Sequence, residues 1–414
     1  MVGPREPGFE HQIQNEVFLA DTYFGFNGKI SEKFPFLLEF QIPTAARGQV
    51  SLYRFSTELI YKENFKLELG KFLIPFGHYN ELYSADKFLT VTRPLLYASP
   101  DSLDLALRLN SPRPPFSSGY TDIGAKASYY PQTNHFWIPS ELTAFIVNGL
   151  GENGNRLRTF QNTNNLLVKG PPITGVNLDF GHQNNNLADN NNNKAPGGRI
   201  VFSLGDLKIP LPFEETKIEL NGVRLGASAL YGRYDLEEGI AGQDYRIWGT
   251  DFIFQYKDFS FSGEYVYSET DFRMAQANTI GNVDFNQSTD NLPSRMEINK
   301  GYYLQSTFPI SRNPPIGEKA IGILAFNKLE RLGPTLLFSN NPNPADQLPI
   351  AAFSSSMGHL KTSIYKYTGG ANLQITENFM MKAEYSHWQI KVPKVFNAKQ
   401  TDINQTAISW VFSF

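Results

Sequence analysis

The stretch ISWVFSF, residues 408–414, places a large apolar side chain at every second position. Side chains of a β-strand point alternately to opposite faces. The four large residues therefore share one face, and the two serines share the other with Val411. A strand of this kind can close a soluble core or separate hydrocarbon from water, and the rest of the chain must decide between the two.

The same alternation recurs in other segments. Each has an uncharged set rich in aromatic residues, and the positions between carry charged or small polar residues such as Arg54, Glu58 and Lys366. The uncharged sets are Tyr53, Phe55, Thr57, Leu59 and Tyr61; Trp248, Thr250, Phe252, Phe254 and Tyr256; Phe259, Phe261, Gly263, Tyr265 and Tyr267; and Tyr365, Tyr367, Gly369, Ala371, Leu373 and Ile375. Several sets begin or end in Tyr or Trp, which favour the boundary between hydrocarbon and water. This pattern favours an outer-membrane β-barrel over a soluble sandwich.

Composition narrows the class of protein further. The chain has 414 residues, of which 14% are aromatic and 19% charged. Its longest uncharged apolar run, positions 320–326, is far shorter than the roughly 18 to 20 residues that a membrane-spanning helix needs. The net charge of −3, without a cluster of Lys and Arg, argues against a nucleic-acid partner. The lack of Cys excludes disulfides and thiolate metal sites.

The joints between strand segments alternate between short and long from position 50 onward. Short joints lie at 62–64, 257–258 and 376–378, and long ones at 75–118, 148–198, 270–299 and 331–360. This alternation predicts a bacterial outer-membrane barrel with short periplasmic turns and long extracellular loops. We expect a single domain, residues 1–414, in which 75–118 and 148–198 are long loops able to fold into the lumen.

The number of strands follows from closure. About fifteen strand patterns can be counted, and the polar stretch 9–15 is the candidate for one more. In hydrocarbon each unpaired backbone N–H or C=O costs several kcal/mol, so the first and last strands must pair. We therefore expect an all-β, transmembrane antiparallel barrel of about 16 strands, or 18 if a long loop contains a further hairpin.

One segment carries a family resemblance. The stretch GKFLIPFGHYNELYSADKFLTVTRPLLY, residues 70–97, resembles the strand-to-loop segment of the phosphate-selective porin O/P-like family, with its GKF, PFG and downstream RP pattern. The resemblance covers this segment, the overall length and the last strand. It implies a trimeric sixteen-stranded channel whose loops fold inward to form a constriction, and it does not establish a phosphate substrate.

Charged residues of the first long loop are candidates for that constriction. Pro75 lacks an N–H and Gly77 permits a turn, so the chain leaves the barrel wall there. The loop then supplies three arginines that can attract anions, or that can pair with nearby acids and hold the loop. The arginines are Arg93, Arg108 and Arg113, and the acids are Asp86, Asp101 and Asp104.

Strand phase assigns further charges to the inner wall. The pore-lining candidates are Arg54, Glu58, Lys126, Arg224 and Lys366. Other inward positions carry Lys66, Lys382, Asp21, Glu39, Glu68, Asp122, Asp251, Glu264 and Glu384. Anion selectivity requires a ring of uncompensated Lys or Arg. The mixture of signs instead predicts weak selectivity.

Metal-binding and catalytic patterns are not found. Asp189, Asn191 and Asn193 have the alternate spacing of a calcium loop, but such a loop needs Gly at position 194 and an acid at 200, where Lys194 and Ile200 stand. The six histidines show no metal-ligand spacing, and His387 beside Ser386 points to the opposite face. We therefore expect no cofactor, no metal and no enzymatic activity.

The sequence predicts an outer-membrane porin for passive diffusion of small polar solutes or ions, a homotrimer surrounded by outer-membrane lipid. The alternative is a barrel scaffold that binds or sheathes an extracellular partner such as an electron-transfer protein. A soluble all-β protein is the third possibility. The transported solute and the preference for anions or cations depend on loop residues that strand phase does not place.

Overall fold

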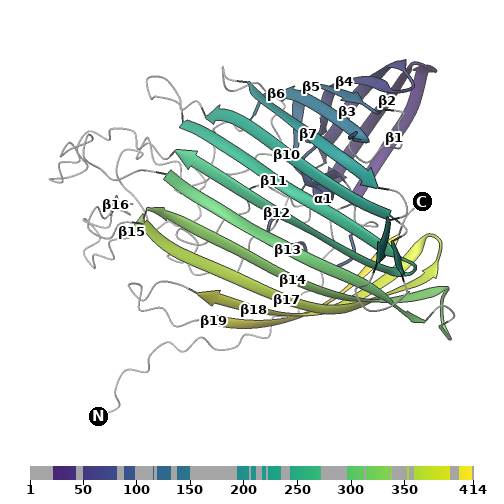
Figure 1. Ribbon diagram of the computed structural model, residues 1–414, viewed down its shortest axis with the longest axis vertical. Helices are drawn as coiled ribbons and strands as arrows, with labels where there is room; N and C mark the ends of the chain where they lie inside the picture. The colour runs from purple at the N-terminus through teal and green to yellow at the C-terminus, as the bar shows by residue number, and fades with distance from the viewer. Residues whose placement is uncertain are drawn as a thin grey trace, which may run out of the picture.

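The protein is described by a computed structural model. It describes residues 22–42, 50–81, 88–97, 115, 119–131, 138–149, 194–204, 207–210, 217–220, 222–234, 243–271, 296–311, 314–334, 336–337, 352–353, 359–391 and 401–412. Within these ranges fifteen strands form one curved antiparallel sheet (Figure 1), in which each strand pairs with its neighbours along the chain. The predicted all-β antiparallel architecture is therefore confirmed.

The strands of this sheet are seven to eighteen residues long. They are β1 (Thr22–Ser31), β2 (Phe34–Ile42), β3 (Ser51–Lys62), β4 (Phe65–Leu73), β5 (Thr121–Tyr129), β6 (Glu141–Val147), β7 (Ala195–Leu204), β10 (Gly222–Tyr234), β11 (Gln243–Tyr256), β12 (Phe259–Asp271), β13 (Met296–Ser311), β14 (Lys319–Pro334), β17 (His359–Thr376), β18 (Phe379–Lys391) and β19 (Thr401–Phe412). Two small hairpins, β8 (Leu207–Pro210) with β9 (Lys217–Leu220) and β15 (Leu336–Leu337) with β16 (Ala352–Phe353), stand outside it. A short helix, α1 (Gly77–Glu81), follows β4.

The two faces of the sheet differ as the alternation predicts. Large aromatic side chains remain exposed on the outer face, among them Trp248 at 44%, Phe259 at 52% and Trp410 at 59%. The alternate positions are polar and buried, as at Asp251, with 3% of its surface exposed, and Lys366, with 1%. The uncharged sets therefore face outward, and the charged ones face the interior.

Tyr53 does not follow this rule. The strand phase predicts an outward ring, but Tyr53 is buried and packs edge-on against Tyr23 with 5.2 Å between ring centroids. The pairing of β2 with β3 shifts at this point, because Glu39 is opposite Arg54 whereas the next residue, Phe40, is opposite Leu52. Tyr53 is thus the extra residue of a β-bulge, which turns its side chain inward.

Short and long connections lie at opposite ends of the strands, as the lengths of the joints predict. Two-residue turns join β3 to β4, β11 to β12 and β17 to β18 at one end of the strands, here called the turn rim. The long connections after β4, β12 and β14 start from the opposite end, the loop rim. Lys257 in the turn between β11 and β12 has a φ of 52°, the positive value that tight hairpin turns require. The hairpin β8–β9 on the turn-rim side is an element that the sequence analysis does not predict.

The ends of the sheet bear on closure. In the described part of the chain β1 pairs only with β2, and β19 only with β18. Because fifteen antiparallel strands leave β1 and β19 running in the same direction, an antiparallel closure needs an even number. The candidate for the sixteenth strand, 9–15, lies outside the described residues, so the expected total of 16 or 18 stays a prediction. Among the described residues no helix has the length and apolar character to cross a membrane.

The hydrophobic core lies inside the curve of the sheet. It joins apolar residues of the segment after β4, such as Ile74, Phe76 and Leu95, to inward wall residues such as Ile247 and Val266. Full burial of a side chain of this kind contributes roughly 1.5 to 3 kcal/mol. The chain after β4 is therefore packed against the inner wall, as a second layer.

Candidate functional site

The candidate site is the segment that follows β4, here called the inward segment and defined as residues 74–81 and 88–97. The ladder ends where Pro75 offers no N–H, and the N–H of Ile74 donates to the carbonyl of Tyr120 at 3.0 Å. Gly77 then takes a φ of +65°, and a Cβ at this position would lie 1.8 Å from Oε1 of Glu264. Glycine thus lets the backbone pass directly over a buried carboxylate of β12.

The first contact region of the inward segment, here called the first anchor, lies over β10 to β12. The N–H of Gly77 donates to Oγ of Ser228 at 3.2 Å, and the N–H of Tyr79 donates to Oε2 of Glu264 at 3.4 Å. The hydroxyl of Tyr97 donates to Oε1 of the same carboxylate at 2.5 Å. The rings of Tyr79 and Tyr97 stack with centroids 4.7 Å apart. One buried acid therefore binds two separate parts of the segment.

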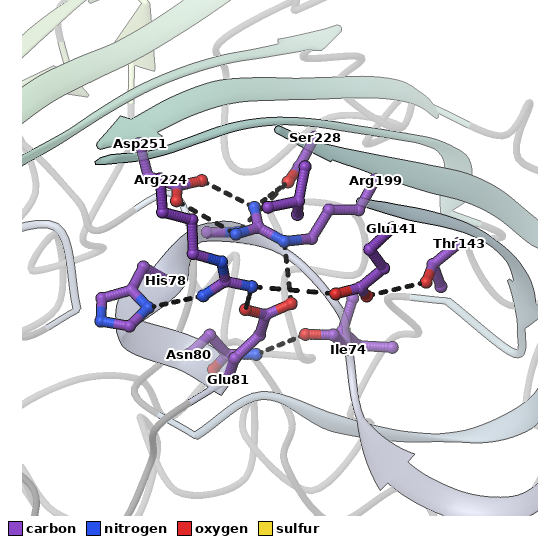
Figure 2. Close-up of polar contacts among 12 residues, drawn as sticks. Ile74, His78, Asn80, Glu81, Glu141, Thr143, Arg199, Arg224, Ser228 and Asp251 are labelled. Carbon is purple, nitrogen blue, oxygen red and sulfur yellow. Dashed lines mark hydrogen bonds and ion pairs between the residues drawn. The ribbon is translucent and has the colours of Figure 1, made fainter. Parts of the chain in front are cut away.

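A buried ionic network completes the first anchor (Figure 2). The guanidinium of Arg199 on β7 forms two contacts with Asp251 on β11, at 2.6 and 3.0 Å, and donates to Oγ of Ser228 at 2.8 Å. Its Nε also forms an ion pair with Glu81 of α1 at 2.8 Å. The side chain of Arg199 is completely buried. A single cation thus joins two wall strands to the helix that covers them.

Arg224 on β10 extends this network toward the lumen. Its Nη2 lies 3.0 Å from Glu81 and 3.8 Å from Glu141, and its Nη1 lies 3.1 Å from Nδ1 of His78. Burial, reinforced by Arg224, lowers the pKa of His78 to about 4, so the ring is neutral at pH 7 and Nδ1 can accept this hydrogen bond. Burial also raises the pKa of Glu81, although Arg199 and Arg224 act in the opposite direction.

The second contact region, here called the second anchor, lies on β17 and β18. Glu384 accepts hydrogen bonds from the N–H of Val91 at 2.7 Å and of Thr92 at 3.2 Å, and also from the Thr92 hydroxyl. Lys366 donates to that hydroxyl and to the carbonyl of Arg93, the latter at 3.2 Å. Wall side chains thus take the place of the ladder partners that a strand would supply.

Three further wall residues bind the backbone on either side. Asn372 donates to the carbonyl of Leu89 at 2.9 Å, and Lys382 donates to that of Phe88. Asn327 on β14 accepts from the N–H of Leu95 at 3.2 Å. The inward segment therefore follows the inner wall from β10 to β18, and the wall satisfies its main-chain groups along the way.

The predicted wall residues lie in these contacts or beside them. Arg54 pairs with Glu39, Glu58 lies 3.8 Å from Lys66, and Lys126 pairs with Glu68. Arg224 belongs to the first anchor and Lys366 to the second. The structure brings these last two together with the inward segment and leaves the other three on β3 and β5. Their role as pore-lining charges stays a prediction.

The predicted loop residues are placed less fully. The carbonyl of Arg93 accepts from Lys366. The remaining residues of the proposed constriction, Arg108, Arg113, Asp101 and Asp104, lie outside the described residues, as does most of the second long loop, 150–193. The constriction that these residues were expected to form therefore stays a prediction.

Sequence reasoning misses the cation at the centre of the first anchor. Arg199 is not among the predicted inward residues, and the predicted loop extends to residue 198, whereas β7 begins at Ala195. A signal was present: strand phase turns both Asp251 and Glu264 inward on adjacent strands, and two buried acids need a cation nearby. In the described part of the chain, no three His, Cys, Asp or Glu residues gather as a metal site requires.

No family model and no curated protein matches this sequence. Among solved structures, OmpT of Vibrio cholerae in a trimer form is 11% identical, with a TM-score of 0.49, over 96% of this chain and 92% of that one. The outer membrane channel DcaP of Acinetobacter baumannii is 12% identical, with a TM-score of 0.45, over 95% and 85%. An anion-selective porin from Comamonas acidovorans is 11% identical, with a TM-score of 0.44, over 94% and 87%. All these TM-scores lie below 0.5, so the fold assignment depends on the strand pairing and the two faces described above.

The chain is an outer-membrane β-barrel protein. Its outward face carries large apolar side chains, as at Phe26, 60% exposed, and Ile408, 63% exposed, whereas its inward face carries buried, paired charges such as Arg199 and Asp251. A sheet with this arrangement is stable when hydrocarbon covers the outer face and water or polar groups cover the inner one. The expected location, the bacterial outer membrane, follows from these two faces.

Proposed function

We propose that this chain forms an outer-membrane channel through which small polar solutes or ions diffuse passively. The observation that carries the proposal is the inward segment, which is bound to the polar inner wall at both anchors. A segment held in this way narrows the lumen without requiring a bound partner or cofactor. In the proposed channel it acts as the fixed constriction that a diffusion channel needs. No catalytic step is part of the proposal.

The proposed channel is weakly selective. Several described cations of the inner wall are paired with acids: Arg54 with Glu39, Lys126 with Glu68, and Arg199 with Asp251. A strong anion filter depends on cations whose charge is not compensated. The pairs that line this wall therefore support a pore through which both anions and cations pass.

A homotrimer is the proposed assembly. The family resemblance of residues 70–97 implies one, and OmpT of Vibrio cholerae is known in a trimer form. Chemical cross-linking in the native membrane tests this point. A ladder that stops at three subunits is the expected result, and a monomer at all cross-linker concentrations would contradict it.

Planar-bilayer recording of the purified protein tests the channel itself. We expect steady single-channel conductance and, under a salt gradient, a reversal potential close to zero. A barrel that sheathes a partner would give little conductance, because the partner or the inward segment would occupy the lumen. Absence of steady conductance in correctly folded protein would therefore favour the scaffold and overturn the channel.

A further inference from the structure

Four lysines lie on the outer face of neighbouring strands at the loop rim. This group, here called the lysine patch, consists of Lys300 on β13, Lys328 on β14, Lys361 on β17 and Lys391 on β18. Each is next in sequence to a buried inward residue: Asn299, Leu329, Thr362 and Ile390 respectively. Because neighbouring strands are about 4.8 Å apart, the four span roughly 15 Å.

Contacts within the lysine patch hold the ammonium groups close together. The ring of Tyr365 carries two of them, with Nζ of Lys391 4.7 Å and Nζ of Lys328 5.6 Å from the centroid. Glu330 lies 2.7 Å from Nζ of Lys361 and 3.1 Å from that of Lys328. One carboxylate and one aromatic ring thus gather three cations, and Lys300 is directly opposite Glu330 on the next strand.

The acids on this face do not neutralise the lysine patch. Glu330 is already in contact with two lysines, and its side chain is only 11% exposed, whereas that of Lys361 is 61% exposed. Asp402 on β19, and Glu269 and Asp271 on β12, are the other acids on the strands beside the patch. Glu269 is opposite Arg246, so those two charges balance. On the four strands that carry the patch, four outward lysines face one outward acid, Glu330, which leaves a local excess of positive charge.

The depth of the lysine patch indicates the head-group region. A row of aromatic residues lies on the same face toward the middle of the strands, including Phe326 and Tyr367, which is 45% exposed. A Lys on the lipid face costs roughly 2 to 4 kcal/mol at mid-membrane but about 0 to 1 kcal/mol near the interface. The lysines therefore lie above the aromatic row, where lipid phosphates are found.

The turn rim offers a contrast. Lys62 stands over the ring of Tyr61 at 5.7 Å, and Lys257 over that of Tyr256 at 5.2 Å. Each of these lysines is followed directly by an acid, Glu63 or Asp258. Both are isolated lysines over one tyrosine. A gathered excess of cations is found at the loop rim and not at these turns.

We propose that the lysine patch binds the phosphate groups of a phosphorylated lipid in the membrane leaflet at the loop rim. An ammonium group is a compact cation suited to phosphate oxygens, and an ordered tyrosine with a paired glutamate fixes the positions of the ammonium groups in advance. The proposal is independent of channel activity, because every residue in it faces away from the lumen.

The test compares lipid binding by three forms of the intact protein in detergent, using native mass spectrometry with added diphosphoryl lipid A. A Lys near an anionic lipid surface contributes about fivefold in affinity. We therefore expect the triple variant Lys328→Gln, Lys361→Gln and Lys391→Gln to bind roughly 100-fold more weakly than the parent. The matched control, Lys62→Gln with Lys257→Gln, should bind as the parent does.

Further arms of the experiment identify what is recognised. The dephosphorylated lipid should bind both parent and triple variant weakly, and inorganic phosphate should not displace the lipid. If the triple variant does not fold, the single variant Lys391→Gln should show a loss of about fivefold, and Lys391→Arg should retain binding. Equal lipid binding by parent and variants, or displacement by millimolar inorganic phosphate, would overturn the proposal.

Discussion

The two anchors hold the same segment by different means. At the first anchor, side chains of the segment take part: Glu81 binds two wall arginines, and Tyr97 binds Glu264. At the second anchor the wall residues Glu384, Lys366 and Asn372 bind mainly main-chain atoms. The first anchor therefore depends on the identity of the residues in the segment, whereas the second depends mainly on where its backbone runs.

Removal of the central cation should break the first anchor most severely. Arg199→Met leaves Asp251 buried beside no guanidinium, and loss of one partner of a buried ion pair typically costs 3 to 5 kcal/mol. We expect a lower unfolding midpoint and rapid proteolysis within 74–81. Arg233→Met, on the exposed side of β10, is the control and should change little. Restoration of the midpoint by the double variant Arg199→Met with Asp251→Leu would show that the unpaired charge is the cause.

Gly77→Ala should have the next largest effect. An L-residue in the left-handed region costs roughly 1 to 2 kcal/mol, and its Cβ would displace the Glu264 carboxylate that holds Tyr79 and Tyr97. We expect a loss of at least about 2 kcal/mol, measured as the unfolding free energy by denaturant titration. Gly222→Ala, where a Cβ meets no atom closer than 3.7 Å, is the matched control. An unchanged first anchor in the Gly77 variant would contradict this account of the turn.

At the second anchor, substitution of a wall residue should destabilise the contact more than substitution of a side chain in the inward segment. Glu384→Gln removes the charge from hydrogen bonds to two N–H groups and should cost roughly 1 to 2 kcal/mol. Val91→Ala changes a segment side chain but leaves its N–H in place, so its cost should be below about 1 kcal/mol. For each variant, the rate of proteolysis within 88–97 and the noise of the single-channel current measure how firmly the segment is held. If Val91→Ala has a larger effect than Glu384→Gln, the second anchor depends on the side chains of the segment, contrary to this account.

The last prediction is a pH dependence centred on His78 of the first anchor. The pKa of His78 is lowered from 6.5 to about 4, so an unfolded chain takes up a proton as the pH falls below about 6.5 while the folded one does not. The contribution of neutral His78 to stability is present above pH 6.5 and is lost as the pH falls toward 4. The unfolding midpoint should follow this window, and His78→Gln should reduce the slope. If the unfolding midpoint of the variant changes with pH as steeply as that of the parent, the pH dependence comes from groups other than His78.

Sequence periodicity predicts the sheet because the alternation within each strand is enough to show which residues lie on which face. The outward Trp248 and the inward Asp251 and Lys366 follow from alternation alone. Tyr53 was placed wrongly because a bulge is a property of strand pairing, and the residues on one strand do not reveal where the register shifts. A periodic pattern therefore determines the faces only between irregularities of the ladder.

The contacts of the inward segment were beyond sequence reasoning for a different reason. The N–H of Gly77 meets Ser228, 151 positions away, and Lys366 meets Thr92 across 274 positions. No local preference links such residues, because their proximity depends on the curvature of the whole sheet. Arg224 and Lys366 were correctly turned inward by phase, but their partners in the segment required the fold.

The second anchor has a practical consequence for protein engineering. Since β17 and β18 bind the stretch 88–92 through its main-chain groups, replacement of its side chains leaves most of those bonds intact. New charges or aromatic rings can be introduced at Leu89 or Val91 while the barrel that carries them stays unmodified. If the chain is the proposed channel, this stretch is where side chains can be exchanged to change permeation.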